Sequence, residues 1–155
     1  MKVSWPNSIV LVACLLSVFS PSASRAQSAS SAERQLFDAV NRERRSRRLT
    51  ALRWDESLAD AARNHALEMA KRNSVSHQFL GEPNLPSRAR QAGARYTWLA
   101  ENVDQAPNAA TIHQRFMFSP LHRANILGTD MDSVGIGMAE RNGQLFVVED
   151  FCQAK

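Results

Sequence analysis

The sequence predicts an α+β domain in which a mainly antiparallel sheet lies between two layers of helices, a three-layer α/β/α sandwich. Apolar residues recur at helical spacing in several segments before residue 128. Two strand-forming runs follow, 133–140 and 144–151, joined around Asn142-Gly143, which is a strong hairpin signal. Both runs are apolar almost without interruption, as expected for strands covered on both faces. With 155 residues, 44% of them hydrophobic, the chain has room for one domain.

The first helix is expected from Ala32 to about Arg47, with an apolar stripe that includes Leu36 and Val40. Its C-terminal part is basic. We interpret these cations as a solvated last turn that complements the negative end of the helix dipole, rather than as a site for an anionic polymer. No aromatic interleaving or binding motif supports nucleic acid as a partner. The basic residues are Arg42, Arg44, Arg45, Arg47 and Arg48.

Asp55 can cap a second helix, whose small apolar residues fall on one face. His65 lies on that face and is expected to be a packed, hydrogen-bonded core residue. The small side chains predict that another element packs closely against this helix. The face consists of Leu58, Ala61, Ala62, Ala66, Met69 and Ala70.

Shorter elements fill the middle of the chain. The stretch "SVSHQFL" is typical of an extended or turn segment and carries His77, and a small helix is expected over 86–92. Strand-forming residues over 96–103 reach Glu101, which is expected at the end of the strand. Asn108 can cap the next helix.

The stretch "SPLHRANILG", residues 119–128, predicts a complete short helix. Ser119 can cap it with its side chain, Pro120 suits the first position, and Gly128 can end it in a left-handed conformation. His122 then lies in the first turn, where the helix dipole favours a neutral imidazole that can bind metal or accept a proton. A carboxylate within about 4–6 Å would reverse this preference, and Glu101 is the candidate partner.

Residues 1–26 have the pattern of an export signal, with a positive start at Lys2, an apolar stretch over 9–19 and a small-x-small cleavage site. A flexible tether is expected over 27–31, and the folded domain over 32–155. Cleavage removes two basic residues and no acid, which lowers the formal net charge from +4 to +2. We expect a secreted or periplasmic protein that does not span the membrane, because a spanning helix needs about 20 apolar residues.

The cysteines restrict the covalent chemistry. "LVAC", ending at Cys14, resembles a lipobox, but the apolar run continues past it, so a lipid anchor is the less favoured alternative. After cleavage Cys152 stands alone and no intramolecular disulfide can form. We expect Cys152 to be a buried or stray thiol, or at most a dimer link, and the protein to be a monomer.

Few residues could carry chemistry. The sequence has no GxSxG, HExxH, P-loop or dinucleotide fingerprint. The polar residues that remain at the ends of apolar elements are His77, Glu101 and His122. These three are the candidate site residues, although spacing alone does not bring them together, and no catalytic role is assigned.

Eight short motifs occur in an order that resembles the CAP superfamily of cysteine-rich secretory proteins, antigen 5 and pathogenesis-related proteins, in its short bacterial SCP-like branch. The resemblance covers roughly residues 33–152. It implies an α/β/α sandwich, export, and a central cleft of two histidines and two glutamates that binds zinc in some members. The motifs are "L..VN..R", "L.WD..LA..A..HA", "SH", "R....G", "AEN", "SPLHRANIL", "VGIG" and "LFVVEDF".

The family's site residues carry over in part. His77 matches the first cleft histidine, Glu101 of "AEN" the first glutamate, and His122 the second histidine. The second glutamate is missing, because Ser119 stands in its place and Phe116 in the place of the preceding tryptophan. The family's cysteine pattern is also absent.

This departure weakens a zinc site, which wants about four tetrahedral ligands. His77 and His122 are the metal candidates, and Glu101 can orient one imidazole instead of binding metal itself. Glu149 or Asp150 could add an acid, but adjacent strand residues point to opposite sides, so only one of them can face the cleft. No cofactor is required, and zinc is the one that the cleft could hold.

The first functional hypothesis is a noncatalytic module that binds a cell-envelope glycan, a lipid or a protein partner through the His/Glu cleft. The second is a metal-dependent hydrolase that uses His77, Glu101 and His122. In the third, these side chains only tie the helices to the sheet.

Overall fold

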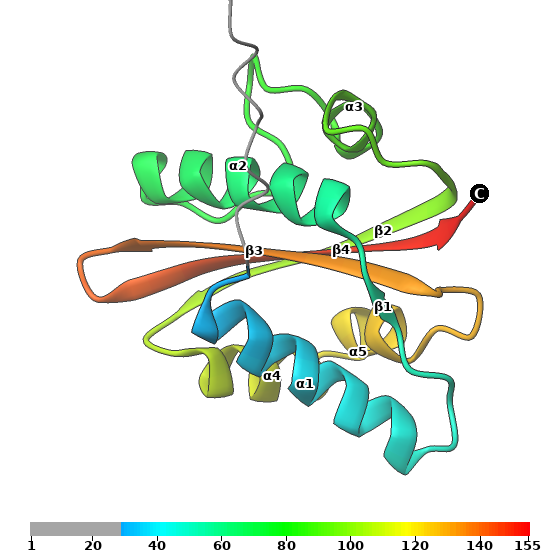
Figure 1. Ribbon diagram of the computed structural model, residues 1–155. Coiled ribbons are helices and arrows are strands. Elements are labelled where there is room, and N and C mark those ends of the chain that lie inside the picture. The colour runs from blue at the N-terminus through cyan, green and yellow to red at the C-terminus, as the bar shows by residue number, and fades with distance from the viewer. Residues whose placement is uncertain (1–28) are drawn as a thin grey trace, which may run out of the picture.

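The computed structural model describes residues 29–155. The expected signal peptide, Cys14 and the first tether residues lie outside this range. Within it the chain forms five helices and four strands (Figure 1), and no described helix is both long and apolar enough to cross a bilayer. The elements are α1 (Ser31–Ser46), β1 (Arg53–Trp54), α2 (Glu56–Arg72), α3 (Leu85–Gln91), β2 (Tyr96–Ala106), α4 (Ala109–Phe118), α5 (Pro120–Leu127), β3 (Ser133–Arg141) and β4 (Gln144–Ala154).

The four strands form one mixed sheet in the order β1-β3-β4-β2. Only the short β1 is parallel to its neighbour, and the β3–β4 and β4–β2 pairs are antiparallel. The predicted hairpin is confirmed: Asn142 and Gly143 have φ of 52° and 71°, as a tight turn between antiparallel strands requires. β2 lies at one edge of the sheet.

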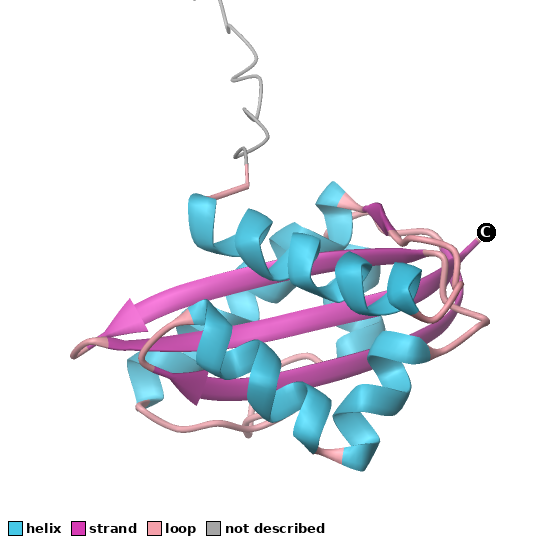
Figure 2. Ribbon diagram, turned by 90° about the horizontal axis from the view of Figure 1, so that it is seen from below, coloured by secondary structure: helices cyan, strands magenta, loops and turns pink. Residues whose placement is uncertain are grey.

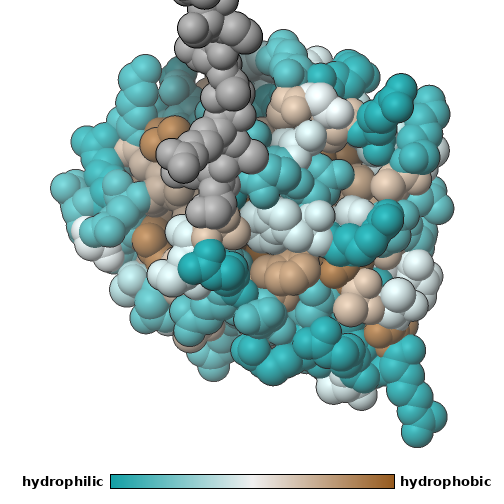
Figure 3. All heavy atoms as spheres, viewed as in Figure 1, coloured by the Kyte–Doolittle hydropathy of each residue, from teal (hydrophilic) through white to brown (hydrophobic). Residues whose placement is uncertain are grey.

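Helices cover both faces, which confirms the predicted α/β/α sandwich. α2 and α3 lie above the sheet in the view of Figure 1, and α1, α4 and α5 lie below it. Figure 2 shows this lower layer in front of the strands. The face seen in Figure 3 is mainly hydrophilic, with small, separate hydrophobic patches.

α2 packs directly on β3, as its small side chains predict. A Cβ atom on Gly135 would overlap the backbone nitrogen of Ala59, and one on Gly137 would overlap that of Arg63. No side chain fits into such a space. The "VGIG" motif therefore has a packing role, because its glycines let the helix approach the strand.

The core has two main parts, one on each face of the sheet. The larger part lies against α1, α4 and α5 and includes Leu36, Phe116 and Phe151. The other lies against α2. His65 is fully buried there, with Nδ1 2.6 Å from Glu82 and Nε2 2.8 Å from the Ser76 carbonyl, so its predicted role as a hydrogen-bonded core residue is confirmed.

Arg44 is not in a solvated turn, so that expectation is wrong for this residue. Its guanidinium is buried and donates to the carbonyls of Thr50, Ile126 and Gly128 at 2.8 Å, and to Met131 at 3.3 Å. Two of these carbonyls belong to the C-terminal end of α5. Burial without a carboxylate partner lowers the pKa of Arg44.

This contact also corrects the expected end of α5. Gly128 has φ of −58°, not a left-handed conformation. A left-handed residue normally helps to satisfy the last helix carbonyls, and here Arg44 does so instead. The start of α5 also differs from the prediction. Ser119 occupies the capping position, but its side chain makes no capping hydrogen bond.

Cys152 is buried in the sheet, which is one of the alternatives expected for it. Burial raises the pKa of its thiol to about 11. A thiol in such surroundings is a poor nucleophile, because the thiolate is the reactive form.

Candidate functional site

The candidate site lies at the edge of the sheet formed by β2. Glu101 is in the middle of this strand rather than at its end, because β2 continues to Ala106. Neighbouring side chains on a strand point to opposite faces. Glu101 therefore points toward the layer of α2 and α3, and Asn102 toward the layer of α4 and α5.

Glu101 is a buried carboxylate that holds two partners. One oxygen lies 2.8 Å from Nδ1 of His77, which comes from the loop between α2 and α3. The other oxygen accepts an ion-paired hydrogen bond from the Arg88 guanidinium of α3. Arg88 also donates to the His77 carbonyl at 3.1 Å. The loop, the helix and the strand are thus joined at this carboxylate.

His77 is fixed on one side and open on the other. Its side chain is 62% exposed, and Nε2 makes no hydrogen bond within residues 29–155. The hydrogen bond to Glu101 raises the pKa of His77, with burial acting in the opposite direction. The ring therefore presents a positively charged N–H donor to solvent over a wider pH range than a free histidine.

Asp150, rather than Glu149, faces this side of the site. It is the cross-strand neighbour of Glu101 and is fully buried. Neither of its oxygens has a hydrogen-bond donor within the described chain. Burial, followed by the charge of Glu101, raises its pKa well above the ordinary value. When Asp150 is protonated, its O–H can donate a hydrogen bond to Glu101, and the two neighbouring acids no longer repel each other.

Glu149 points to the opposite face, where it joins a network under α5. One of its oxygens accepts from Asn102 at 3.0 Å, and the other has no partner within the described residues. Burial raises its pKa to about 8. The Asn102 side chain also donates to the His122 carbonyl at 3.2 Å and accepts from Asn125 at 2.8 Å. The sequence analysis did not predict this network. The only sequence signals that could have indicated it are the "AEN" and "RAN" stretches, which contain Asn102 and Asn125.

Within residues 29–155 no hydrogen bond or ion pair joins His122 to Glu101, so the direct pair, one of the two alternatives for His122, does not form. Its ring packs edge-on against Phe116, with centroids 5.0 Å apart. Burial lowers its pKa, and the charge of His77 adds to this effect while Asp104 opposes it. His122 is therefore a neutral imidazole, as its place in the first helical turn predicts. It lies within electrostatic reach of His77, across the β2 edge.

The donors at this edge do not fit a zinc site. Among residues 29–155, no group of three or more His, Cys, Asp or Glu side chains is placed to hold a metal ion. Both oxygens of Glu101 are already bound, one of them to a guanidinium. At most the two imidazoles, His77 and His122, remain, and structural zinc takes about four ligands.

The site also lacks an assembled nucleophile. No hydroxyl or thiol donates to an imidazole within the described part of the chain. The Ser119 hydroxyl has no such contact, and Cys152 is buried and protonated. Nucleophilic catalysis needs a nucleophile within hydrogen-bond reach of its base.

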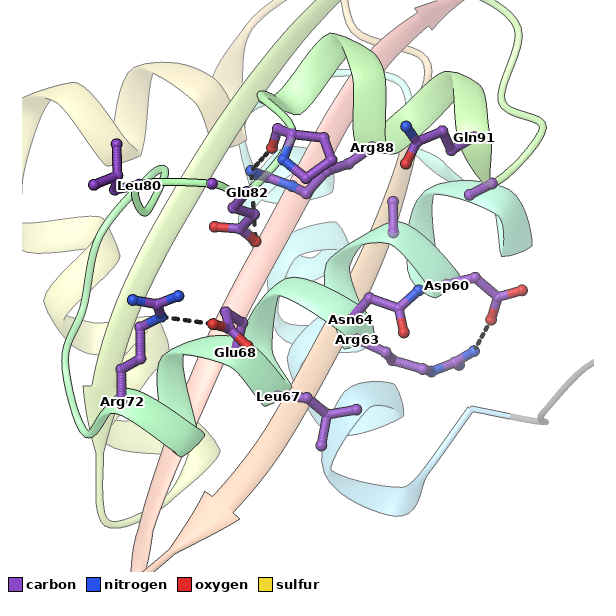
Figure 4. A pocket seen from close by; sticks show the side chains of 14 residues that line it. Asp60, Arg63, Asn64, Leu67, Glu68, Arg72, Leu80, Glu82, Arg88 and Gln91 are labelled. Carbon is purple, nitrogen blue, oxygen red and sulfur yellow. Dashed lines mark hydrogen bonds and ion pairs between the residues drawn. The ribbon is translucent and has the colours of Figure 1, made fainter.

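A groove of about 890 Å³ lies between α2 and the segment 80–92 (Figure 4). Charged side chains line it, but most of them pair with one another. Arg63 binds Asp60 at 2.9 Å, and Arg72 binds Glu68 at 2.6 Å. Arg88 forms part of this groove and also binds Glu101, so the groove and the candidate site share one wall.

Comparisons place this geometry among known proteins. The chain is 27% identical over 114 residues to the protein YkwD of Bacillus subtilis, which covers 73% of this chain and 44% of YkwD. An extracellular protein containing an SCP domain from Bacillus anthracis has a TM-score of 0.73 and 25% identity over 78% of this chain and 40% of that one. An outer surface protein of Borrelia burgdorferi has a TM-score of 0.72 and 18% identity over 79% of this chain and 92% of that one.

This chain thus spans less than half the length of YkwD and of the Bacillus anthracis protein, so their full activities do not transfer to it. The profile of the cysteine-rich secretory protein family, CAP, matches residues 37–151. That range is most of the chain and contains His77, Glu101 and His122. The chain therefore belongs to the CAP family, in its bacterial branch.

Proposed function

We propose that the protein is a secreted, noncatalytic binding module for a cell-envelope glycan that carries carboxylates, and that His77 contacts this ligand. The observation that carries the proposal is the orientation of His77. Glu101 holds Nδ1 at 2.8 Å, and 62% of the side chain is exposed, so Nε2–H faces solvent. A charged donor in this position suits a carboxylate.

The surroundings of His77 favour binding over catalysis. Glu101 is occupied by His77 and Arg88 and is not free to act as a base. Location outside the cell is supported by the Bacillus anthracis relative, which is described as extracellular.

The test is cosedimentation of the protein, purified after export, with isolated peptidoglycan sacculi. We expect binding to persist in a metal chelator, because no step of the proposal uses a metal. His77→Ala should weaken binding about tenfold, the loss of one good charge-assisted contact. Lys71→Ala is the matched control, because it removes an exposed positive charge from the same helical layer, and it should change binding by less than about twofold.

Other outcomes separate the alternatives. Binding that a chelator abolishes and zinc restores would contradict the proposal and support the metal-dependent hydrolase. Equal binding by wild type and His77→Ala would remove His77 from the contact. A lower melting temperature of His77→Ala with unchanged binding would favour a purely structural role. Binding to a lipid or a protein instead of sacculi would replace the glycan as ligand.

A further inference from the structure

Two hydrophobic side chains are exposed to solvent at the corner where α4 meets α5. Phe118 ends α4 and is 87% exposed, and Leu121 in the first turn of α5 is 80% exposed. Ser119 and Pro120 join them in a tight turn. Two large exposed apolar side chains only three positions apart mark a candidate contact site, since leaving them in water is unfavourable.

The two helices that meet at this corner carry no acidic side chain of their own. No aspartate or glutamate occurs between Gln105 and Asp130, a stretch that contains both helices. Arg115 is neutralised by Asp104 at 3.0 Å. Arg123, next to the corner, is exposed and makes no ion pair within residues 29–155; the one hydrogen bond of its side chain in this range is to the Met117 carbonyl.

α1 adds further cations to the same layer. It packs beside α4 and α5 on the same face of the sheet (Figure 2). Burial lowers the pKa of His113 of α4, Glu43 opposes this effect, and the charge of Arg42 adds to it, so Arg42 and Glu43 both lie near α4. Three exposed arginines in the C-terminal part of α1 and just after it have no ion-pair partner in the described range; they are Arg42, Arg45 and Arg48.

We propose that the layer formed by α1, α4 and α5 docks on an anionic membrane surface. Phe118 and Leu121 enter the interface between head groups and acyl chains, while Arg123 and the α1 arginines attract the anionic head groups. A stable protein interface buries roughly 800 Å² on each partner, far more than two side chains supply. A bilayer needs no such complementary area. This inference is independent of the proposed glycan site.

The test is cosedimentation with vesicles of phosphatidylcholine and phosphatidylglycerol, compared with phosphatidylcholine alone. We expect binding only to the anionic vesicles, with loss of binding as salt rises through about 0.5 M. Phe118→Ser and Leu121→Ser should each weaken binding about tenfold. Arg42→Gln and Arg45→Gln should each weaken it about fivefold.

Leu80→Ser is the matched control. Leu80 is 98% exposed but belongs to the layer of α2 and α3, on the other side of the sheet, so its loss should leave vesicle binding unchanged. Equal effects of Leu80→Ser and Leu121→Ser, or equal binding to neutral and anionic vesicles, would overturn the proposal. His77→Ala should bind vesicles like wild type, which separates this surface from the glycan site.

Discussion

Glu149 is a buried acid whose replacement should stabilise the fold. It is fully buried, its pKa is raised to about 8, and only Asn102 donates to it. In the unfolded chain a glutamate titrates near 4.3 to 4.5. The unfolded state therefore loses this proton first, and the free energy of unfolding falls as pH rises from about 4.5 to about 8.

The size of the effect follows from these two pKa values. The raised pKa of Glu149 lowers the free energy of unfolding by about 3 kcal/mol at pH 7, and by less than about 1 kcal/mol at pH 5. Glu149→Gln keeps an oxygen for Asn102 and has no charge to bury. We expect it to raise the free energy of unfolding by about 3 kcal/mol at pH 7, with a melting temperature higher by roughly 10 °C.

The assay is urea unfolding followed by circular dichroism at several pH values between 4.5 and 8. The gain from Glu149→Gln should grow steadily with pH. Glu140→Gln, an exposed acid on the neighbouring strand β3, is the control and should change stability by less than about 0.5 kcal/mol at any pH. A gain at pH 7 no larger than that at pH 5 would refute the burial argument.

Three further predictions concern packing, burial and the candidate site. Gly137→Ala should cost at least about 3 kcal/mol in urea unfolding, because its Cβ would overlap the α2 backbone, whereas Gly128→Ala, at an ordinary φ, should cost less than about 1 kcal/mol. Arg44→Met should cost about 3–5 kcal/mol, because it leaves several buried carbonyls without donors; a loss below about 1 kcal/mol would contradict this. Binding to sacculi should weaken as pH rises through the raised pKa of His77, since only the charged ring attracts a carboxylate; pH-independent binding between 6 and 9 would contradict the role given to that charge.

The sequence predicts the architecture well because the signals are local. Asp55 and Asn108 cap their helices through their own side chains, and Asn142-Gly143 makes its own turn. Alternation and apolar runs then determine which faces are covered. None of these inferences needs a contact between distant residues.

The errors arise where a distant side chain changes a local outcome. Gly128 does not take the left-handed conformation that a helix end favours, because Arg44, distant in sequence, binds the carbonyls there. His122 does not meet Glu101 either, because Glu101 points toward the layer of α2 and α3 whereas His122 belongs to α5, in the other layer. Spacing along the chain carries no information about which face of the sheet a distant side chain meets.

The choice between Glu149 and Asp150 also required the register of the sheet. Alternation alone shows that they face opposite sides. The pairing of β2 with β4 then places Asp150 beside Glu101 and Glu149 beside Asn102. Two buried acids on opposite faces of one strand thus have different cross-strand neighbours.

The central claim is that Glu101 holds His77 as an exposed, charged donor for a glycan carboxylate. The most direct test is a nitrogen-15 NMR titration of the His77 ring, in wild type and Glu101→Gln, with and without soluble peptidoglycan fragments. We predict a pKa above the ordinary 6.5 in wild type, a lower one in Glu101→Gln, and a shift of the Nε2 signal when fragments are added to wild type. A wild-type pKa of His77 at or below 6.5, together with an Nε2 signal that does not change when the fragments are added, would contradict the claim.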